Sequence, residues 1–250
     1  MPKVDIHPYE RVDDLQTPSG YRLIQNPEWF CFGVDAVLLA DFAAGTIKAQ
    51  TNILDMCTGN GIIPVLLCEK TEGTHISGIE IQAKVAEMAK RSILLNGLEE
   101  RVSIVEGDLR DTAKFFGKAS FDAVCCNPPY KENHGGLKNA KDSVTIARHE
   151  ILCNLEGIIE SAEKVLKPSG KLYLIHRPER LADIFYLMRS HKIEPKRLRM
   201  IHPSPSKTAT MVLVEGAKHG RPKLFLEPPL YVHDENGEYT DEIEQIYNRV

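Results

Sequence analysis

The sequence lacks the features that mark membrane-spanning, secreted and metal-binding proteins. No apolar stretch in its 250 residues approaches the roughly 18 that a membrane helix needs. The start, Met1 to Asp5, has no apolar core of a secretory signal. Its 6 cysteines include no Cys-x-x-Cys pair and its 9 histidines form no His-Glu-x-x-His pattern, so no bound metal is expected. Together these absences predict a cytoplasmic protein that does not enter the membrane.

The composition is that of an ordinary globular chain, with 42% hydrophobic and 26% charged residues, enough for one sizeable core. The chain shows no internal repeat, no low-complexity segment and no clear linker. We therefore predict one domain over residues 1–250, made of an N-terminal flank (1–50), a core (51–216) and a C-terminal extension (217–250).

Apolar runs alternate with helical patterns through the core, which is typical of an α/β fold with a mostly parallel sheet. Strands are predicted at 51–56, 75–81, 102–106, 121–126 and 171–176, with two further β runs near 196–201 and 208–215. Helices are predicted at 61–70, 82–96, 152–166 and 180–190. A polar, glycine-containing loop over 131–150 follows the fourth strand, and a loop of that length beside a site is usually functional.

Charge is unevenly distributed along a chain whose net charge is −4. From 187 to 223 nine basic residues face two acidic ones, and from 224 to 250 the balance reverses. Such a basic stretch is a candidate contact surface for phosphates, although the two signs could also neutralise each other on a solvated surface. The candidate phosphate contacts in this stretch are Lys196, Arg197, Arg199, Lys207, Lys218, Arg221 and Lys223.

The most informative motif is Asn127-Pro128-Pro129-Tyr130, directly after the fourth predicted strand. The two prolines remove two backbone donors and fix φ, and a residue before proline is held extended. The Asn127 side-chain carbonyl and the Pro128 backbone carbonyl then form two acceptors beside the flat face of Tyr130. This arrangement fits a planar substrate that carries an NH2 group, whereas the alternative is an ordinary proline turn that ends a strand.

A glycine-containing loop follows the first predicted strand, where an open α/β sheet binds its ligand. It runs from Asp55 to Gly61, and Gly59 and Gly61 allow a tight turn and a close approach of a ligand to the backbone. The dinucleotide fingerprint requires a third glycine where this chain has Pro64, which disfavours NAD.

Carboxylates stand at the ends of three successive predicted strands, with no basic residue among them. Glu80 can accept hydrogen bonds from both ribose hydroxyls, Asp108 from an adenine amino group, and Asp55 from an ammonium group. Each carboxylate alone could instead cap the following helix. Together with the glycines, the three predict a site for a cationic adenosine ligand.

These motifs resemble those of class I S-adenosylmethionine-dependent methyltransferases of the amino-methylating group, whose hallmark is (Asn/Asp/Ser)-Pro-Pro-(Tyr/Phe/Trp) after the fourth strand. The resemblance implies a Rossmann-like fold with a mostly parallel seven-stranded sheet, helices on both faces and an antiparallel final strand. It also implies S-adenosyl-L-methionine as the cofactor. Cys57 stands where that family has its first loop glycine.

The same resemblance assigns site residues. It implies that the cofactor contacts Asp55, Gly59, Gly61, Glu80, Asp108, Leu109 and Asn127. It implies that the catalytic corner consists of Asn127, Pro128, Pro129 and Tyr130.

The segment before the first strand narrows the resemblance. The run from Gly33 to Ala40, shortly after Trp29, is similar to the pre-core motif of the bacterial tRNA1(Val) (adenine37-N6)-methyltransferase family, as are short runs at 215–218, 228–230 and 237–240. This implies a cofactor-site role for Gly33 and Asp35 and N6-methylation of an adenine in RNA, namely adenine 37 of a valine tRNA. RNA, and specifically tRNA, is then the expected partner.

Further phosphate contacts are expected from Lys131 and Arg148 in the long loop. Besides methylation of a DNA adenine or of a guanine amine in ribosomal RNA, two alternatives stay open. The first is a glutamine N5-methyltransferase that acts on a translation release factor, ranked second because only 1–54 precede Asp55 and that family usually carries a longer helical domain there. The second is a non-catalytic nucleic-acid-binding module on a methyltransferase scaffold. The sequence leaves the oligomeric state open.

Overall fold

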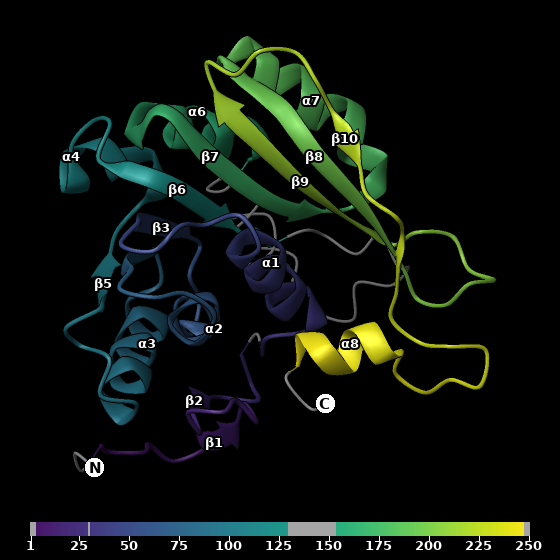
Figure 1. The fold of residues 1–250 in the computed structure, drawn as a ribbon. Coiled ribbons are helices and arrows are strands. Elements are labelled where there is room, and N and C mark those ends of the chain that lie inside the picture. The colour runs from purple at the N-terminus through teal and green to yellow at the C-terminus, as the bar shows by residue number, and fades with distance from the viewer. Residues whose placement is uncertain (1–3, 30, 130–153, 248–250) are drawn as a thin grey trace, which may run out of the picture.

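A computed structural model describes residues 4–29, 31–129 and 154–247 of the chain. Within them, a central nine-stranded sheet is flanked by helices on both faces (Figure 1). From one edge its longer strands are β5 (Val102–Glu106), β4 (His75–Glu80), β3 (Asn52–Met56), β6 (Phe121–Cys126), β7 (Leu166–His176), β9 (Met211–Lys218) and β8 (Ile193–His202). Neighbouring strands are parallel except that β9 runs antiparallel to both β7 and β8. This confirms the predicted Rossmann-like fold and its antiparallel final strand.

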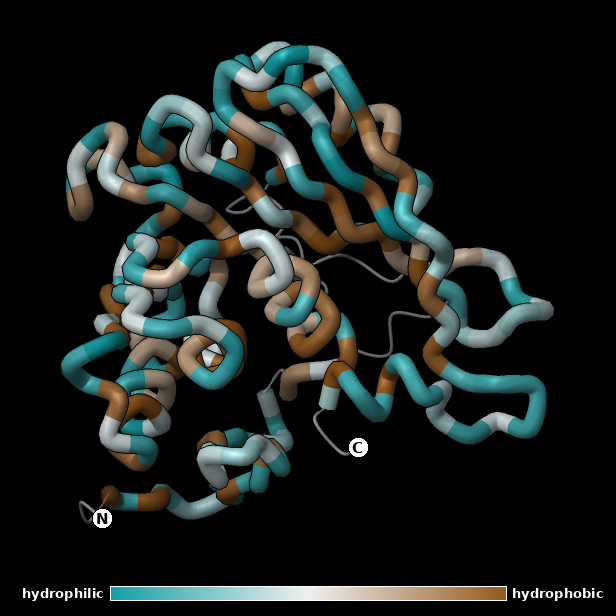
Figure 2. The backbone as a smooth tube through the Cα atoms, viewed as in Figure 1, coloured by the Kyte–Doolittle hydropathy of each residue, from teal (hydrophilic) through white to brown (hydrophobic). Residues whose placement is uncertain are grey.

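The central strands are buried on both sides because their alternate residues contribute to two different cores. Ile53 and Cys125 face one core, and Leu54 and Cys126 face the other. The first core contains α1 (Val34–Ala44), α2 (Ile62–Lys70) and α3 (Ala83–Leu95). The second contains α4 (Thr112–Phe116), α6 (Leu155–Val165) and α7 (Leu181–Ser190). Figure 2 shows the corresponding concentration of hydrophobic residues in the middle of the molecule.

The N-terminal flank contains a two-stranded antiparallel sheet, β1 (Arg11–Asp14) with β2 (Arg22–Gln25), which the sequence did not predict. The β2 backbone is held by side chains of α3 and its C-cap: Ser92 accepts from the Ile24 N–H at 3.1 Å and Asn96 from the Arg22 N–H at 2.8 Å. The hairpin is therefore fastened to the core by residues far along the chain.

The C-terminal extension adds two short strands and a helix, which were also not predicted. β10 (Phe225–Leu226) and β11 (Leu230–Tyr231) pair with β8, and α8 (Asp241–Ile246) contacts α1. Ile243 and Ile246 of α8 belong to the same buried cluster as α1 and α2. The extension therefore packs on the core that positions the site.

Several predicted boundaries were wrong near prolines. β7 begins at Leu166 rather than at 171, and β8 extends over Ile193–His202 rather than 196–201. The strand pairing shifts register near each proline. The shift between Phe121 and Ala123 of β6 lies opposite the part of β7 that contains Pro168, and the other shift lies between Pro195 and Arg197 of β8. Such irregular positions tolerate a residue that has no backbone N–H. The predicted loop 131–150 lies outside the described residues. No helix in the described ranges is long and apolar enough to span a membrane.

Candidate active site

The carboxyl ends of four neighbouring strands bring the predicted site residues to one edge of the sheet. In the order β6, β3, β4, β5, these ends carry Asn127, Asp55, Glu80 and Asp108. Adjacent strands lie about 4.8 Å apart, so the row is about 14 Å long. The chain reverses its strand order at β3, which is where open α/β sheets bind ligands.

Asp55 is completely buried at the centre of this row. Its Oδ2 accepts a hydrogen bond from the Thr58 hydroxyl at 2.6 Å, whereas its Oδ1 has no hydrogen-bond partner among the described residues. Burial, reinforced by the nearby charge of Glu80, raises the pKa of Asp55 to about 8, although the Thr58 bond opposes the shift. A buried acceptor without a partner is costly unless a ligand supplies a donor.

The loop after β3 has the tight geometry predicted from its glycines. Gly59 and Gly61 have φ of 56° and 86°, and a Cβ on Gly59 would meet no heavy atom within 4 Å. The backbone at Gly59 therefore borders open space that a ligand can fill. Cys57 also has a left-handed φ of 57°, which explains why glycine suits this position in related loops.

Glu80 at the end of β4 is buried and organises the same loop. Its Oε2 accepts from the Gly59 N–H at 3.1 Å, and its Oε1 accepts from the Gln82 backbone N–H at 3.0 Å. Oε1 also accepts from the Gln82 side-chain Nε2 at 3.3 Å, so its two lone pairs are engaged, whereas Oε2 retains one lone pair for a ribose hydroxyl. The geometry is compatible with the predicted ribose contact.

Asp108 and Leu109 follow β5. Asp108 caps the short 3-10 helix η1 (Leu109–Asp111), accepting from the Arg110 N–H at 2.9 Å, and Arg110 also forms an ion pair that lowers the pKa of Asp108. Leu109 is buried in the second core. An adenine amino group at Asp108 would therefore share the carboxylate with Arg110.

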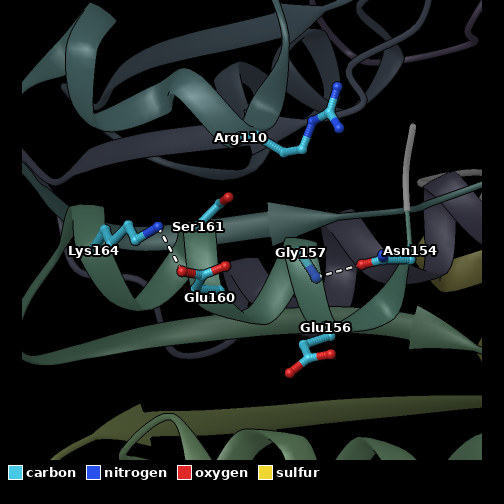
Figure 3. Close-up of a pocket in the computed structure, with 7 residues that line it drawn as sticks. All are labelled: Arg110, Asn154, Glu156, Gly157, Glu160, Ser161 and Lys164. Carbon is cyan, nitrogen blue, oxygen red and sulfur yellow. Dashed lines mark hydrogen bonds and ion pairs between the residues drawn. The ribbon is translucent and has the colours of Figure 1, made fainter. Parts of the chain in front are cut away.

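A groove of about 230 Å³ lies between Arg110 and α6 (Figure 3). In Figure 3, Arg110 lies on one side of the groove and α6 on the other, and within the second half of α6 Glu160 pairs with Lys164 at 2.7 Å. The lining residues are polar or charged, and none of the predicted cofactor residues is among them. The groove borders the site without containing its chemistry.

Asn127 is half-buried immediately after β6, followed by a buried Pro128 and an exposed Pro129. Its Nδ2 donates to Oδ2 of Asp35 at 3.0 Å. Asp35 lies in the first turn of α1, after Gly33 at the N-cap, and is 9% exposed. The structure therefore brings Asp35 to the predicted catalytic corner. Tyr130, the last residue of the motif, lies outside the described residues.

A second polar connection, which the sequence reasoning missed, ties the N-terminal hairpin to the glycine-containing loop. Gln25 is 2% exposed, and its Oε1 accepts from the Phe32 N–H at 3.1 Å and from the Asn60 side chain at 3.3 Å. Its Nε2 donates to Asp13. No motif marks Gln25, because its three partners lie in separate parts of the chain, 7, 12 and 35 positions away.

Three of the predicted phosphate contacts are already paired within the chain. Arg197 lies 3.0 Å from Glu215 as an ion pair, Arg199 pairs with Glu242 at 2.7 Å, and Lys218 pairs with Glu163 at 3.0 Å while 8% exposed. These contacts fasten the sheet to the C-terminal extension and to α6. Arg197, Arg199 and Lys218 would have to share or release these carboxylates to contact a phosphate, and their role as phosphate contacts stays a prediction.

The other basic residues lie at two different ends of the sheet. Lys196, Arg221 and Lys223 lie near the start of β8, and the exposed Lys207 lies beyond its end. Because β8 runs in the same direction as β7 and β6, Lys207 is at the edge that carries Asn127. The first group is about 20 Å or more from that edge, at 3.3 Å per strand residue. Lys131 and Arg148 lie outside the described residues.

Side chains that could hold a metal do not cluster in the described ranges: no group of three or more His, Cys, Asp or Glu residues is close enough to hold an ion. Cys125 and Cys126 are both fully buried in β6 and belong to the cores.

Comparisons with known proteins place this geometry in a family. A family model described as the methyltransferase small domain matches residues 34–183. A Porphyromonas gingivalis protein named tRNA1(Val) (adenine(37)-N6)-methyltransferase is 29% identical over 246 residues, covering 95% of this chain and 91% of that protein. An Aliivibrio fischeri protein of the same name is 25% identical over 209 residues, covering 83% and 85%.

Among solved structures, the chain is similar to a predicted O-methyltransferase, Atu636 from Agrobacterium tumefaciens, with a TM-score of 0.70 and 24% identity. The match covers 86% of this chain and 95% of that one. At this identity the similarity shows the fold alone.

Proposed function

Because the chain belongs to the methyltransferase small-domain family and is therefore an enzyme, we propose that it methylates the N6 amine of an adenine in tRNA, with S-adenosyl-L-methionine as the methyl donor. The relatives' names favour adenine 37 of a valine tRNA as the target. The observation that carries the proposal is the alignment of Asp55, Glu80 and Asn127 at adjacent strand ends, at the turning point of the sheet.

The residues present fit the proposed cofactor. Asp55 Oδ1 is a buried acceptor without a partner, which an ammonium group would satisfy. Glu80 Oε2 offers an acceptor for a ribose hydroxyl, and Gly59 leaves the backbone open to close approach. When bound, S-adenosylmethionine supplies an electrophilic methyl group on a sulfonium centre.

The catalytic corner would act on the substrate amine by accepting hydrogen bonds. An adenine amine is a poor nucleophile, because its lone pair is conjugated into the ring. Acceptance of its two N–H bonds by the Asn127 side-chain carbonyl and the Pro128 backbone carbonyl favours tetrahedral geometry and stabilises the positive charge that develops on nitrogen. No general base is required, since the methylated ammonium is acidic enough to release its proton to water. Tyr130 keeps its predicted role as a stacking face.

An unpaired base in an RNA loop suits this site better than a base in a duplex. The target base must leave its stack, which costs a few kcal/mol and least where the base is already unpaired. We propose Lys207 as a phosphate contact, together with Arg180, which the sequence reasoning missed. The Arg180 side chain is 48% exposed after the end of β7, and its exposed ion pair with Asp183 at 2.7 Å would be shared with or exchanged for a phosphate.

The test is to incubate the protein with labelled S-adenosylmethionine and, separately, total tRNA, ribosomal RNA, DNA and a release factor. We expect label in tRNA, and N6-methyladenosine at position 37 of valine tRNA when the product is digested and analysed by mass spectrometry. Label in the release factor alone would establish the glutamine alternative. Cofactor binding without transfer to any acceptor would contradict an adenine methyltransferase.

A further inference from the structure

The hydrogen bond between Asp35 and Asn127 joins α1 to the catalytic corner across 92 positions of sequence. We propose that Asp35 is a positioning residue that fixes the orientation of the Asn127 amide. This inference rests on the proposed role of Asn127. Asp35 holds the amino end of the amide, so that the carbonyl end faces the substrate amine.

Orientation matters because the two ends of an asparagine amide are similar in size and opposite in chemistry. The oxygen accepts hydrogen bonds and the NH2 group donates them. A flipped Asn127 would present donors to a substrate that also presents donors, and the corner would lose one of its two acceptors. A carboxylate only accepts. Asp35 therefore selects the orientation in which Asn127 Nδ2 points at it, at 3.0 Å, and Oδ1 points elsewhere.

The local structure around Asp35 holds its carboxylate in place. Asp35 is in the first turn of α1, an 11-residue helix, where the positive end of the helix dipole favours an anion. It is 9% exposed, so the bond to Asn127 competes little with water. A Cβ on Gly33 would stand 2.9 Å from Asp35 Oδ1, closer than real contacts allow. The glycine two residues before the aspartate therefore leaves room for the carboxylate.

The resemblance instead assigns Asp35 to cofactor binding, and substitutions distinguish the two roles. The test variants are Asp35→Ala and Asp35→Asn. The control is Asp41→Asn on the same helix, whose carboxylate pairs with Lys70 at 2.9 Å rather than with the corner. For each variant, single-turnover methyl transfer to the acceptor labelled by the wild type, affinity for labelled cofactor and the melting temperature are measured.

Loss of a hydrogen bond to a charged group should lower transfer by about 10- to 100-fold. Cofactor affinity should stay within a few-fold of the wild type, and melting should match that of Asp41→Asn. Equal loss of affinity and transfer would overturn the proposal.

A spectroscopic measurement tests the same idea without any substrate. The side-chain amide signals of Asn127 in a ¹⁵N spectrum are assigned by their absence in Asn127→Ala. We expect Asp35→Ala to shift them and to speed their exchange with water, and Gly33→Ala, which crowds the carboxylate, to shift them as well. Gly45→Ala at the other end of α1, where a Cβ meets its nearest atoms at 3.8 Å, should leave them in place.

Unchanged Asn127 signals in Asp35→Ala would refute the positioning role whatever the protein methylates. If the wild type labels no nucleic acid, the proposed function fails, and the amide signals still decide the contact between Asp35 and Asn127.

Discussion

At the scale of single residues, Asp55 shows a site that is incomplete without its ligand. A carboxyl group that is fully buried, with one oxygen unpartnered and Glu80 nearby, is unfavourable when charged. Among the described residues, the Thr58 hydroxyl supplies the one hydrogen bond that offsets part of this cost. A buried carboxyl group with a raised pKa at a strand end is a candidate for binding a cation.

The first prediction concerns stability and pH. The pKa of Asp55 is raised from 3.8 to about 8 in the folded protein, so between these values the folded state holds a proton that the unfolded state has released. This group therefore makes the cofactor-free protein less stable as pH rises from about 4 to about 8. Asp55→Asn, which resembles the protonated form, should remove that dependence. As pH rises from 5 to about 8.5, the melting temperature of the variant should exceed that of the wild type by a growing margin. From there to about pH 9 the margin should stay constant. Parallel curves throughout would show that Asp55 titrates normally.

The second prediction concerns Glu80 and its neighbour in register, Glu106. Glu80→Gln should weaken cofactor binding by at least about tenfold, because the substitution removes the negative charge and replaces one acceptor oxygen with a donor NH2 group. Glu106 pairs with Glu80 across β4 and β5 but is exposed, so Glu106→Gln is the matched control and should bind normally. Calorimetric titration with S-adenosylmethionine measures both. An unchanged affinity in Glu80→Gln would remove it from the ribose site.

The third prediction concerns Asn127. Asn127→Ala should abolish detectable methyl transfer while cofactor affinity stays within a few-fold, since the side chain is proposed to hold the substrate amine. Filter binding of labelled cofactor and single-turnover transfer provide the comparison. A parallel fall in both quantities would contradict a role in catalysis.

At the scale of elements, the sequence could predict the parts whose pattern is local. The runs predicted as strands at 51–56 and 121–126 are mostly apolar and short, which is typical of strands buried on both faces, and the structure confirms them as β3 and β6. The Asn127 corner and the carboxylates were found because each stands at or just after the carboxyl end of a predicted strand. The hairpin β1–β2 was missed because its partners, Ser92 and Asn96, are 68 and 74 positions away. The same reason hid Gln25 and the pairing of Arg197 with the extension.

The fourth prediction tests that hairpin. Asn96 accepts from the Arg22 N–H at 2.8 Å and donates to the Arg22 carbonyl at 2.7 Å. Asn96→Ala should lower the free energy of unfolding by about 1–3 kcal/mol, because two backbone groups lose their partner. Asn236→Ala, in an exposed turn, is the control and should change it by less than about 0.5 kcal/mol. Denaturant titration gives both values, and hydrogen exchange should locate the loss at β2.

At the scale of the whole molecule, the distribution of charge relative to the sheet matters more than the charge of any segment. The basic stretch seemed continuous along the sequence, but the fold places Lys207 at the edge with Asn127 and Lys196, Arg221 and Lys223 at the opposite end. The acidic extension neutralises part of the remainder, since Glu227 lies 3.1 Å from Arg197. The sequence could not predict this separation, because it depends on the direction of β8.

The fifth prediction follows from that separation. If the RNA contacts the edge that carries Asn127, Lys207→Gln should weaken tRNA binding and reduce the slope of log affinity against log salt by about one contact. The triple variant Lys196→Gln, Arg221→Gln and Lys223→Gln removes more charge, yet should change the slope less, because those residues lie about 20 Å or more from the edge. Filter binding between 50 and 200 mM salt or so separates the two variants. A larger loss in the triple variant would mean that the RNA extends along the whole length of β8, and that the continuous basic stretch of the sequence is its contact surface after all.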